Sequence, residues 1–171
     1  MTIHTGHPFA TPDEERDPVR RFRGRLGGGV TLWAAGASDD RATWSGLTVS
    51  SLLVAEGEPA RLLALLDPES DLSVRLAGTG CAVVSLLGWA ERGIAEMYAG
   101  TAPAPGGPFA HGEFEVTPWG PRLVSASSWV GVRLEDARPL GWSRLVTTVV
   151  ERVEIGADDD PLGHRRGRWT R

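Results

Sequence analysis

Apolar residues along this chain gather in short runs separated by glycine, proline and acidic residues. The runs at 30–35, 61–66 and 81–87 are too short for typical helices, so they predict buried strands. Residues 44–55 are also rich in strand-forming types. From 114 to 155 the pattern predicts further short strands, interrupted at Pro118, Pro121 and Pro139-Leu140-Gly141, and a last strand is expected at 166–170.

Three segments carry helix signals instead. Residues 13–26 begin with three acidic residues, which favour a helix N-terminus, and end at a run of three glycines. Ser70 or Asp71 can cap a helix that runs to about Ala77. Between 89 and 99 the apolar residues recur at helical spacing, and Gly100 follows.

Strands and helices do not alternate regularly, so a doubly wound parallel sheet is not expected. Short strands with a few short helices favour a mainly β fold, a split antiparallel barrel, because closure removes exposed sheet edges. We expect residues 1–12 to form a flexible tail and residues 13–171 to form a single domain.

Composition excludes several classes of function. The formal net charge is -4, which argues against a nucleic-acid-binding protein. All 18 basic residues are arginine, so lysine chemistry is excluded. No apolar run is long enough to span a membrane and the first residues do not resemble a signal peptide, so we expect a cytoplasmic protein that does not bind membranes.

The sequence contains no recognisable catalytic motif. A single cysteine, Cys81, cannot form an internal disulfide, and its apolar run predicts an inert core thiol. His4 and His7 fall in the expected tail, while His111 and His164 fall in polar segments typical of surface histidines. We therefore predict no metal site and identify no catalytic acid, base or nucleophile.

Hydroxyl side chains are concentrated beside Gly46. Thr48, Ser50 and Ser51 lie close together on a predicted strand segment, which suits a flat polar ligand. The helix expected after Ser70 presents N-terminal amides, which commonly bind phosphate. A hydroxyl-rich strand and an ordinary capped helix would explain the same residues without any ligand.

Five motifs in order resemble those of flavin reductase-like proteins with an FMN-binding split barrel. They are Gly29-Val30-Thr31-Leu32-Trp33, Gly46-Leu47-Thr48-Val49-Ser50-Ser51-Leu52, Glu58-Pro59-Ala60, Tyr98-Ala99-Gly100, and Pro161-Leu162 followed by Arg166-Gly167-Arg168-Trp169. The resemblance covers residues 19–169. It implies a homodimer that binds FMN, with FAD as the other candidate, and that passes a hydride from NAD(P)H to flavin.

The resemblance also implies roles for particular residues. Thr48, Val49 and Ser50 are expected against the isoalloxazine ring, and Ser51 stands where the family places a flavin-contacting serine. Ser70 and the amides near Asp71 are expected to hold the flavin phosphate. Some of the seven tryptophans are expected at the dimer interface, and a partner monooxygenase is expected to receive the reduced flavin.

Two departures from the family pattern leave alternatives open. A Gly-Asp-His motif near the nicotinamide is replaced by Gly141-Trp142-Ser143-Arg144, so Trp142 and Ser143 are expected to border the nicotinamide. Glu69 and Asp71 repel a phosphate unless a cation such as Arg75 compensates. The alternatives are a flavin-binding protein without turnover, a relative that uses a deazaflavin, and a cofactor-free interaction protein.

Overall fold

The computed structural model describes residues 17–37 and 39–171. The tail predicted at 1–12, the first residues of the predicted helix at 13–26, and His4 and His7 lie outside the described residues. Three α-helices are described: α1 (Pro18–Leu26), α2 (Asp71–Thr79) and α3 (Arg92–Tyr98). The short 3-10 turns are η2 (Arg41–Thr43), η3 (Trp89–Glu91) and η4 (Pro108–Ala110). No described helix is long and apolar enough to cross a membrane.

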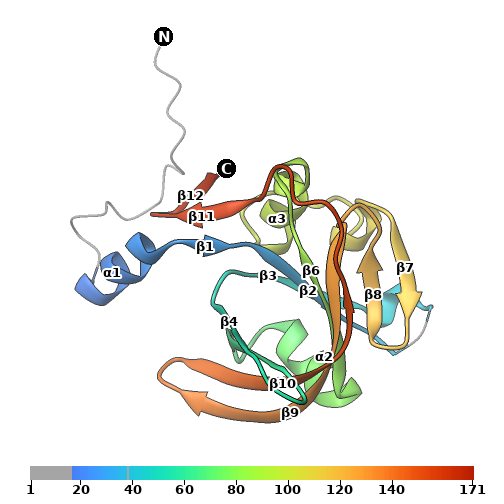
Figure 1. Ribbon diagram of the computed structural model, residues 1–171. Coiled ribbons are helices and arrows are strands. Elements are labelled where there is room, and N and C mark those ends of the chain that lie inside the picture. Colours follow the sequence, from blue (N-terminus) through green and yellow to red (C-terminus); the bar gives the residue numbers. More distant parts are fainter. Residues whose placement is uncertain (1–16, 38) are drawn as a thin grey trace.

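The strands account for most of the fold (Figure 1). Their bounds are β1 (Gly28–Gly29), β2 (Thr31–Ala35), β3 (Ser45–Val49), β4 (Leu52–Ala55), β5 (Arg61–Leu66), β6 (Cys81–Leu86), β7 (Phe114–Thr117), β8 (Gly120–Leu123), β9 (Ser128–Leu140), β10 (Ser143–Glu154), β11 (Gly163–Arg165) and β12 (Arg168–Thr170). The apolar runs predicted as buried strands are confirmed as β2, β5 and β6.

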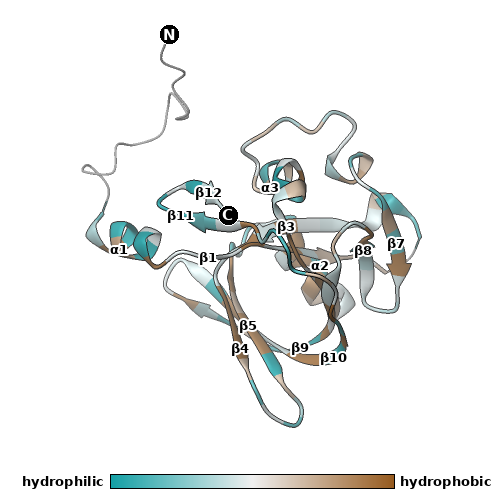
Figure 2. Ribbon diagram, turned by 45° about the horizontal axis from the view of Figure 1, so that its top comes forward, coloured by the Kyte–Doolittle hydropathy of each residue, from teal (hydrophilic) through white to brown (hydrophobic). Residues whose placement is uncertain are grey.

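Seven strands form one antiparallel sheet in the order β3-β2-β6-β9-β10-β5-β4. Its two edge strands, β3 and β4, are separated along the chain by Ser50 and Ser51 alone. Because this link spans only about 10 Å, the sheet must curl until its edges come together. The Leu65 amide donates to the Ser51 carbonyl at 3.1 Å. The predicted split antiparallel barrel is therefore confirmed, and Figure 2 shows its strands following a curved path.

The inner face of the curled sheet forms one hydrophobic core, and α2 packs against it. Leu72 and Leu76 of α2 join Trp33, Leu66 and Val146 in this core. The predicted cap is confirmed, since the Ser73 amide donates to Ser70 Oγ at 3.2 Å. Burial of these large side chains supplies the main stabilisation of the barrel.

A second core lies on the opposite face of β2, under α3 and the β7–β8 hairpin. Its aromatic side chains, Trp44, Tyr98, Phe109 and Phe114, contact one another, three of the pairs having ring centroids 5.0 to 5.3 Å apart. Gly46 leaves room for this cluster, since a Cβ there would lie 2.6 Å from the Tyr98 ring. This glycine is thus required by packing.

Between residues 114 and 155 the structure differs from the prediction of short, interrupted strands. β9 is 13 residues long and β10 is 12 residues long, and Pro139 lies inside β9. Beyond Arg133, β9 pairs with β10 only, because β6 has ended. Proline is tolerated on such a free strand edge. The break predicted at Pro139-Leu140-Gly141 is confirmed, since β9 turns into β10 at Gly141, whereas Pro121 lies inside β8 and does not interrupt it.

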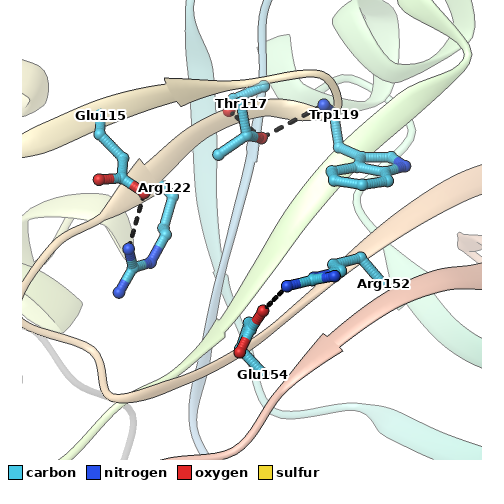
Figure 3. A network of polar contacts seen from close by, with 7 residues as sticks. Glu115, Thr117, Trp119, Arg122, Arg152 and Glu154 are labelled. Carbon is cyan, nitrogen blue, oxygen red and sulfur yellow. Dashed lines mark hydrogen bonds and ion pairs between the residues drawn. The ribbon is translucent and has the colours of Figure 1, made fainter.

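Glutamates pair with arginines on the outer surface near the β7–β8 hairpin (Figure 3). Arg122 lies 2.7 Å from Glu115, and Arg152 pairs with Glu154. We call this surface, with the neighbouring pairs Arg133–Glu151 and Arg61–Glu135, the paired face.

Strand β1, which follows the first helix, joins the last two strands of the chain in a small three-stranded sheet of order β1-β11-β12. α1 precedes it and extends away from the barrel (Figure 1). None of the α1 residues is buried, and the Arg166 amide ties the helix down by donating to the Gly24 carbonyl at 2.8 Å. α1 is therefore a wall beside the barrel and contributes nothing to either core.

Candidate functional site

A cleft of about 930 Å³ lies between α1, the Ser50–Ser51 link, strands β4, β5 and β10, and the β11–β12 hairpin. Its volume falls within the range of small-molecule and cofactor sites. The cleft brings together residues from both ends of the chain, which the curled sheet places side by side.

One end of the cleft is polar and formed largely by backbone. Ser50 and Ser51, both predicted to bind flavin, line it together with Gly27 and Gly167. Gly27 has a φ of 67° and Gly167 a φ of 76°, conformations that a side chain would strain. A ligand at this end meets hydroxyl groups and bare main chain.

The floor of the cleft is apolar. Leu53 of β4 pairs with Leu63 of β5, and Leu65 of β5 pairs with Leu145 of β10. These four leucines line the cleft, as does Leu140. Cross-strand pairing aligns their side chains into one flat surface, which suits the face of an aromatic ring.

The part of the lining that α1 contributes is cationic. Arg20 and Arg23 of α1 line the cleft three residues apart, so they lie on one face of the helix. Asp17 also lines the cleft, but its carboxylate caps the helix and accepts from the amides of Val19 and Arg20. We call Arg20 and Arg23 the arginine wall.

His164 lines the cleft, which the sequence analysis did not expect. It lies in β11, pairs with Gly28 and Trp169, and its ring meets the Trp169 ring edge-on at 5.1 Å. Partial burial, with a smaller contribution from Arg23, lowers the pKa of His164. The neutral imidazole therefore predominates at neutral pH and offers one donor and one acceptor.

A hairpin signal in the sequence could have located this histidine. Arg166 and Gly167 both have positive φ, and they connect β11 to β12 as a two-residue turn. Reading Arg166-Gly167 as a hairpin turn extends the final strand pair back to residue 163, and thereby includes His164.

Thr48 and Val49, predicted against the flavin ring, lie outside the residues that line the cleft. The Thr48 hydroxyl donates to the Ala95 carbonyl at 2.8 Å, which fastens β3 to α3. The Val49 side chain is buried in the barrel core, and its carbonyl accepts from the Thr31 hydroxyl at 2.7 Å. Because its hydroxyl proton is engaged, Thr48 can act toward a ligand only as a hydrogen-bond acceptor.

Ser70, Asp71 and Arg75, predicted to hold the phosphate, lie at α2 and not in the lining of the cleft. The Ser70 hydroxyl donates to the Asp67 carbonyl at 2.7 Å and accepts from the Ser73 amide, so it is already engaged. Arg75 is half-buried, and its Nε has no hydrogen-bond partner among the described residues. Phosphate binding at this helix stays a prediction.

Trp142 and Ser143, predicted beside the nicotinamide, lie where β9 turns into β10. Trp142 is 97% exposed, and neither residue lines the cleft. Their neighbours Leu140 and Leu145 do, so the turn approaches the cleft from one side.

Among the described residues, no group of His, Cys, Asp or Glu side chains could hold a metal ion. His111 lies elsewhere, with Nε2 2.9 Å from the Pro105 carbonyl. The cleft thus combines a flat apolar floor, a polar end and a cationic wall, an arrangement that fits an aromatic heterocycle carrying phosphate groups.

Comparison with known proteins gives consistent matches. A family model described as flavin reductase like domain matches residues 23–171. The reductase component of 4-hydroxyphenylacetate 3-monooxygenase from Thermus thermophilus is 29% identical over 159 residues, 90% of this chain and 98% of that protein.

Two solved structures show the same fold. The NADH:FAD oxidoreductase SgcE6 of Streptomyces globisporus C-1027 superposes with a TM-score of 0.79 at 20% identity, covering 94% of this chain and 98% of that one. The styrene monooxygenase flavin reductase of Pseudomonas putida S12 gives 0.78 at 19% identity, covering 90% and 96%. Because the family model spans most of the sequence, the chain belongs to the flavin reductase-like family, a membership that implies flavin binding.

Proposed function

We propose that this protein is an NAD(P)H:flavin oxidoreductase that binds FMN in the cleft. The observation that carries the proposal is the joining of Ser50 and Ser51 to a flat leucine floor and a cationic wall in one site. Family membership supports the flavin. A structure of SgcE6 in complex with NAD and FAD fragments, at 18% identity and a TM-score of 0.80, supports the pairing of flavin with a nicotinamide nucleotide.

The residues of the cleft fit a flavin in their chemistry. The leucine floor provides an apolar surface for the ring system, and the hydroxyls of Ser50 and Ser51 provide hydrogen bonds to its polar edge. When bound, the flavin supplies the hydride-accepting chemistry, so the protein needs to supply position and electrostatics. The leucines also exclude water from the ring face, and the neutral His164 can donate one hydrogen bond.

Titration with FMN tests the flavin site. We expect micromolar affinity or better, read by flavin fluorescence, and a loss of about two- to tenfold in Ser51→Ala, because one neutral hydrogen bond is removed. Ser125→Ala is the matched control, since Ser125 is exposed and outside the cleft. Absence of FMN binding by the unmodified protein contradicts the proposal.

Turnover distinguishes the proposal from its closest alternative. With FMN bound, we expect the protein to oxidise NADH or NADPH. A protein that binds FMN but oxidises neither is a flavin-binding protein without turnover, and one that binds no flavin is an interaction protein.

We further propose that the protein is a homodimer. Apolar side chains are exposed around the cleft, on α1 at Val19 and Phe22, on β4 at Leu53 and Val54, and at Trp142. An apolar surface of this kind typically marks an interface, and a second copy would close the open cleft. Sedimentation at low micromolar concentration should give twice the 18.3 kDa of the chain. A monomer alone contradicts this proposal.

The physiological role that we propose is supply of reduced flavin to a partner monooxygenase in the cytoplasm. The resemblance to the reductase component from Thermus thermophilus supports it. Co-purification with a flavin-dependent monooxygenase, and oxygenation that depends on this protein, are the expected observations.

A further inference from the structure

We propose that the arginine wall binds the diphosphate of an adenosine diphosphate moiety, the group common to NAD(P)H and FAD. This inference rests on the proposed function, because it assigns the nucleotide end of the same cleft. FMN carries one phosphate and lacks the adenosine diphosphate, so its binding reports mainly on the floor and the serine end of the site.

The two arginines of the wall lack carboxylate partners in the described part of the chain. Among the residues that the structure describes, Arg20 and Arg23 form no ion pair, whereas Arg61, Arg122 and Arg133 each meet a glutamate within 2.8 Å. The protein as a whole is acidic, with a net charge of -4. Two unpaired cations facing one concave surface focus a positive potential on it, which favours an anionic ligand.

Competing carboxylates are absent from the described lining of the cleft apart from Asp17. That carboxylate is occupied in capping α1, at 2.9 Å from the Val19 amide and 3.2 Å from the Arg20 amide. By contrast, the start of α2 carries Asp67, Glu69 and Asp71. Electrostatics therefore favour phosphate groups at the arginine wall over the start of α2.

Spacing argues for two linked phosphates. Residues three apart on a helix have Cβ atoms about 5–6 Å apart, and each guanidinium can hold a phosphate with two parallel hydrogen bonds. The Arg166 amide of the β11–β12 turn donates to the Gly24 carbonyl of α1 at 2.8 Å. The hairpin thus braces α1 where the arginines project.

Continuity with the rest of the cleft argues for a nucleotide over an acidic peptide. Arg20 and Arg23, the leucine floor, His164 and Ser50 all line the same cleft. A ligand that fills this site carries its phosphates at the wall and a flat ring on the floor. Binding of an acidic protein would favour arginines that protrude from the surface over arginines that line a cleft.

Binding of ADP to the full chain, measured by calorimetry without flavin, tests the inference. We expect Arg20→Ala and Arg23→Ala each to weaken ADP by about tenfold, the loss typical of a hydrogen bond to a charged group. Arg25→Ala is the matched control, because it removes the same charge from the same helix but does not line the cleft. It should change ADP affinity by less than about twofold.

His164 supplies a second readout. An anion bound at the wall should raise the pKa of this histidine, measured by NMR with and without ADP, because it offsets the neighbouring positive charge. The charged groups near the ring are Arg20, Arg23 and Asp17 on the α1 side and Arg165, Arg166 and Arg168 in the hairpin, while β1 offers only glycines.

Each result decides the matter. The inference is overturned if ADP does not bind at millimolar concentration, or if Arg25→Ala loses as much ADP affinity as Arg20→Ala and Arg23→Ala. It is also overturned if the arginine wall binds an acidic protein while the arginine variants leave ADP affinity unchanged. Titrating the same variants separately with FAD, NADH and FMN identifies the source: the dinucleotide whose affinity falls in Arg23→Ala is the one whose diphosphate lies at the arginine wall. FMN, which carries a single phosphate, should lose less affinity than ADP in these variants, and FMN binding by the unmodified protein shows independently whether the flavin site is present.

Discussion

Arginines on two faces of this molecule have opposite surroundings. On the paired face, Arg133 lies 2.6 Å from Glu151, which also accepts from the Trp119 indole at 2.7 Å (compare Figure 3 for the adjoining residues). On the arginine wall, no described carboxylate pairs with Arg20 or Arg23. The difference teaches that the same residue type stabilises the sheet where it is neutralised and remains available to a ligand where it is not.

Charge reversal is the strongest test of the difference between the arginine wall and the paired face. Arg23→Glu should weaken ADP by about a hundredfold, because a contact is lost and a repulsive charge is added. Arg133→Glu should leave ADP affinity unchanged and lower stability slightly, since the new side chain faces Glu151. Calorimetry and urea unfolding of both variants provide the measurements. Equal losses of ADP affinity would contradict the division into two faces.

The contribution of the paired face to stability can be measured at Trp119. Its ring packs directly over Gly131, where a Cβ would lie 2.3 Å from it, and its indole donates to Glu151. Trp119→Ala should lower the free energy of unfolding by about 2–4 kcal/mol, through lost packing and a lost hydrogen bond. Val74→Ala is the control, because Val74 is an exposed apolar residue of α2 outside the proposed dimer surface, and it should change stability by less than about 0.5 kcal/mol.

Acid titration examines the ion pairs themselves. Hydrogen bonds from Arg133 and then Trp119 lower the pKa of Glu151. The resulting stabilisation is present above the ordinary carboxyl pKa and is lost as the pH falls through the lowered value in the folded protein. Glu151→Gln should therefore lose part of this acid dependence. Identical pH profiles for the variant and the unmodified protein would show that the pair adds nothing to folding.

The smallest expected effect concerns His164. Its pKa is lowered in the folded protein by burial and by Arg23, so folding disfavours the protonated form. Stability is then full above the ordinary histidine pKa and falls as the pH drops from there toward the lowered value. Urea unfolding between pH 8 and 5, values that bracket the ordinary pKa of about 6.5, should show a shallower decline in His164→Gln. ADP should reduce the decline in the unmodified protein.

Much of the local structure was predictable because it depends on neighbouring residues. The apolar runs became β2, β5 and β6, and Ser70 caps α2 as its position predicts. The interruptions predicted at Pro118 and at Pro139-Leu140-Gly141 are confirmed as turns, whereas Pro121 was read wrongly as a break, because it lies inside β8, a strand that pairs only with β7. The barrel itself was predicted from the absence of alternation and from the family resemblance, and the sheet order confirms it.

The candidate site was predictable only in part. Ser50 and Ser51 line the cleft, while Thr48 is engaged with α3 and Ser70 with its own helix cap. A sequence does not show whether a serine or threonine hydroxyl faces a cleft or is hydrogen-bonded to a backbone carbonyl. Which of them remains free is decided by partners that lie far away along the chain.

The sequence by itself determined the buried strands β2, β5 and β6, the cap of α2 and the family, since each depends on local periodicity or on motifs in order. Only the tertiary structure decided that Arg20, Ser51 and His164 line one cleft. The physical reason is the two-residue link between opposite sheet edges: it forces the barrel to curl, and pairing of β1 with β11 then brings the last residues of the chain beside the first helix.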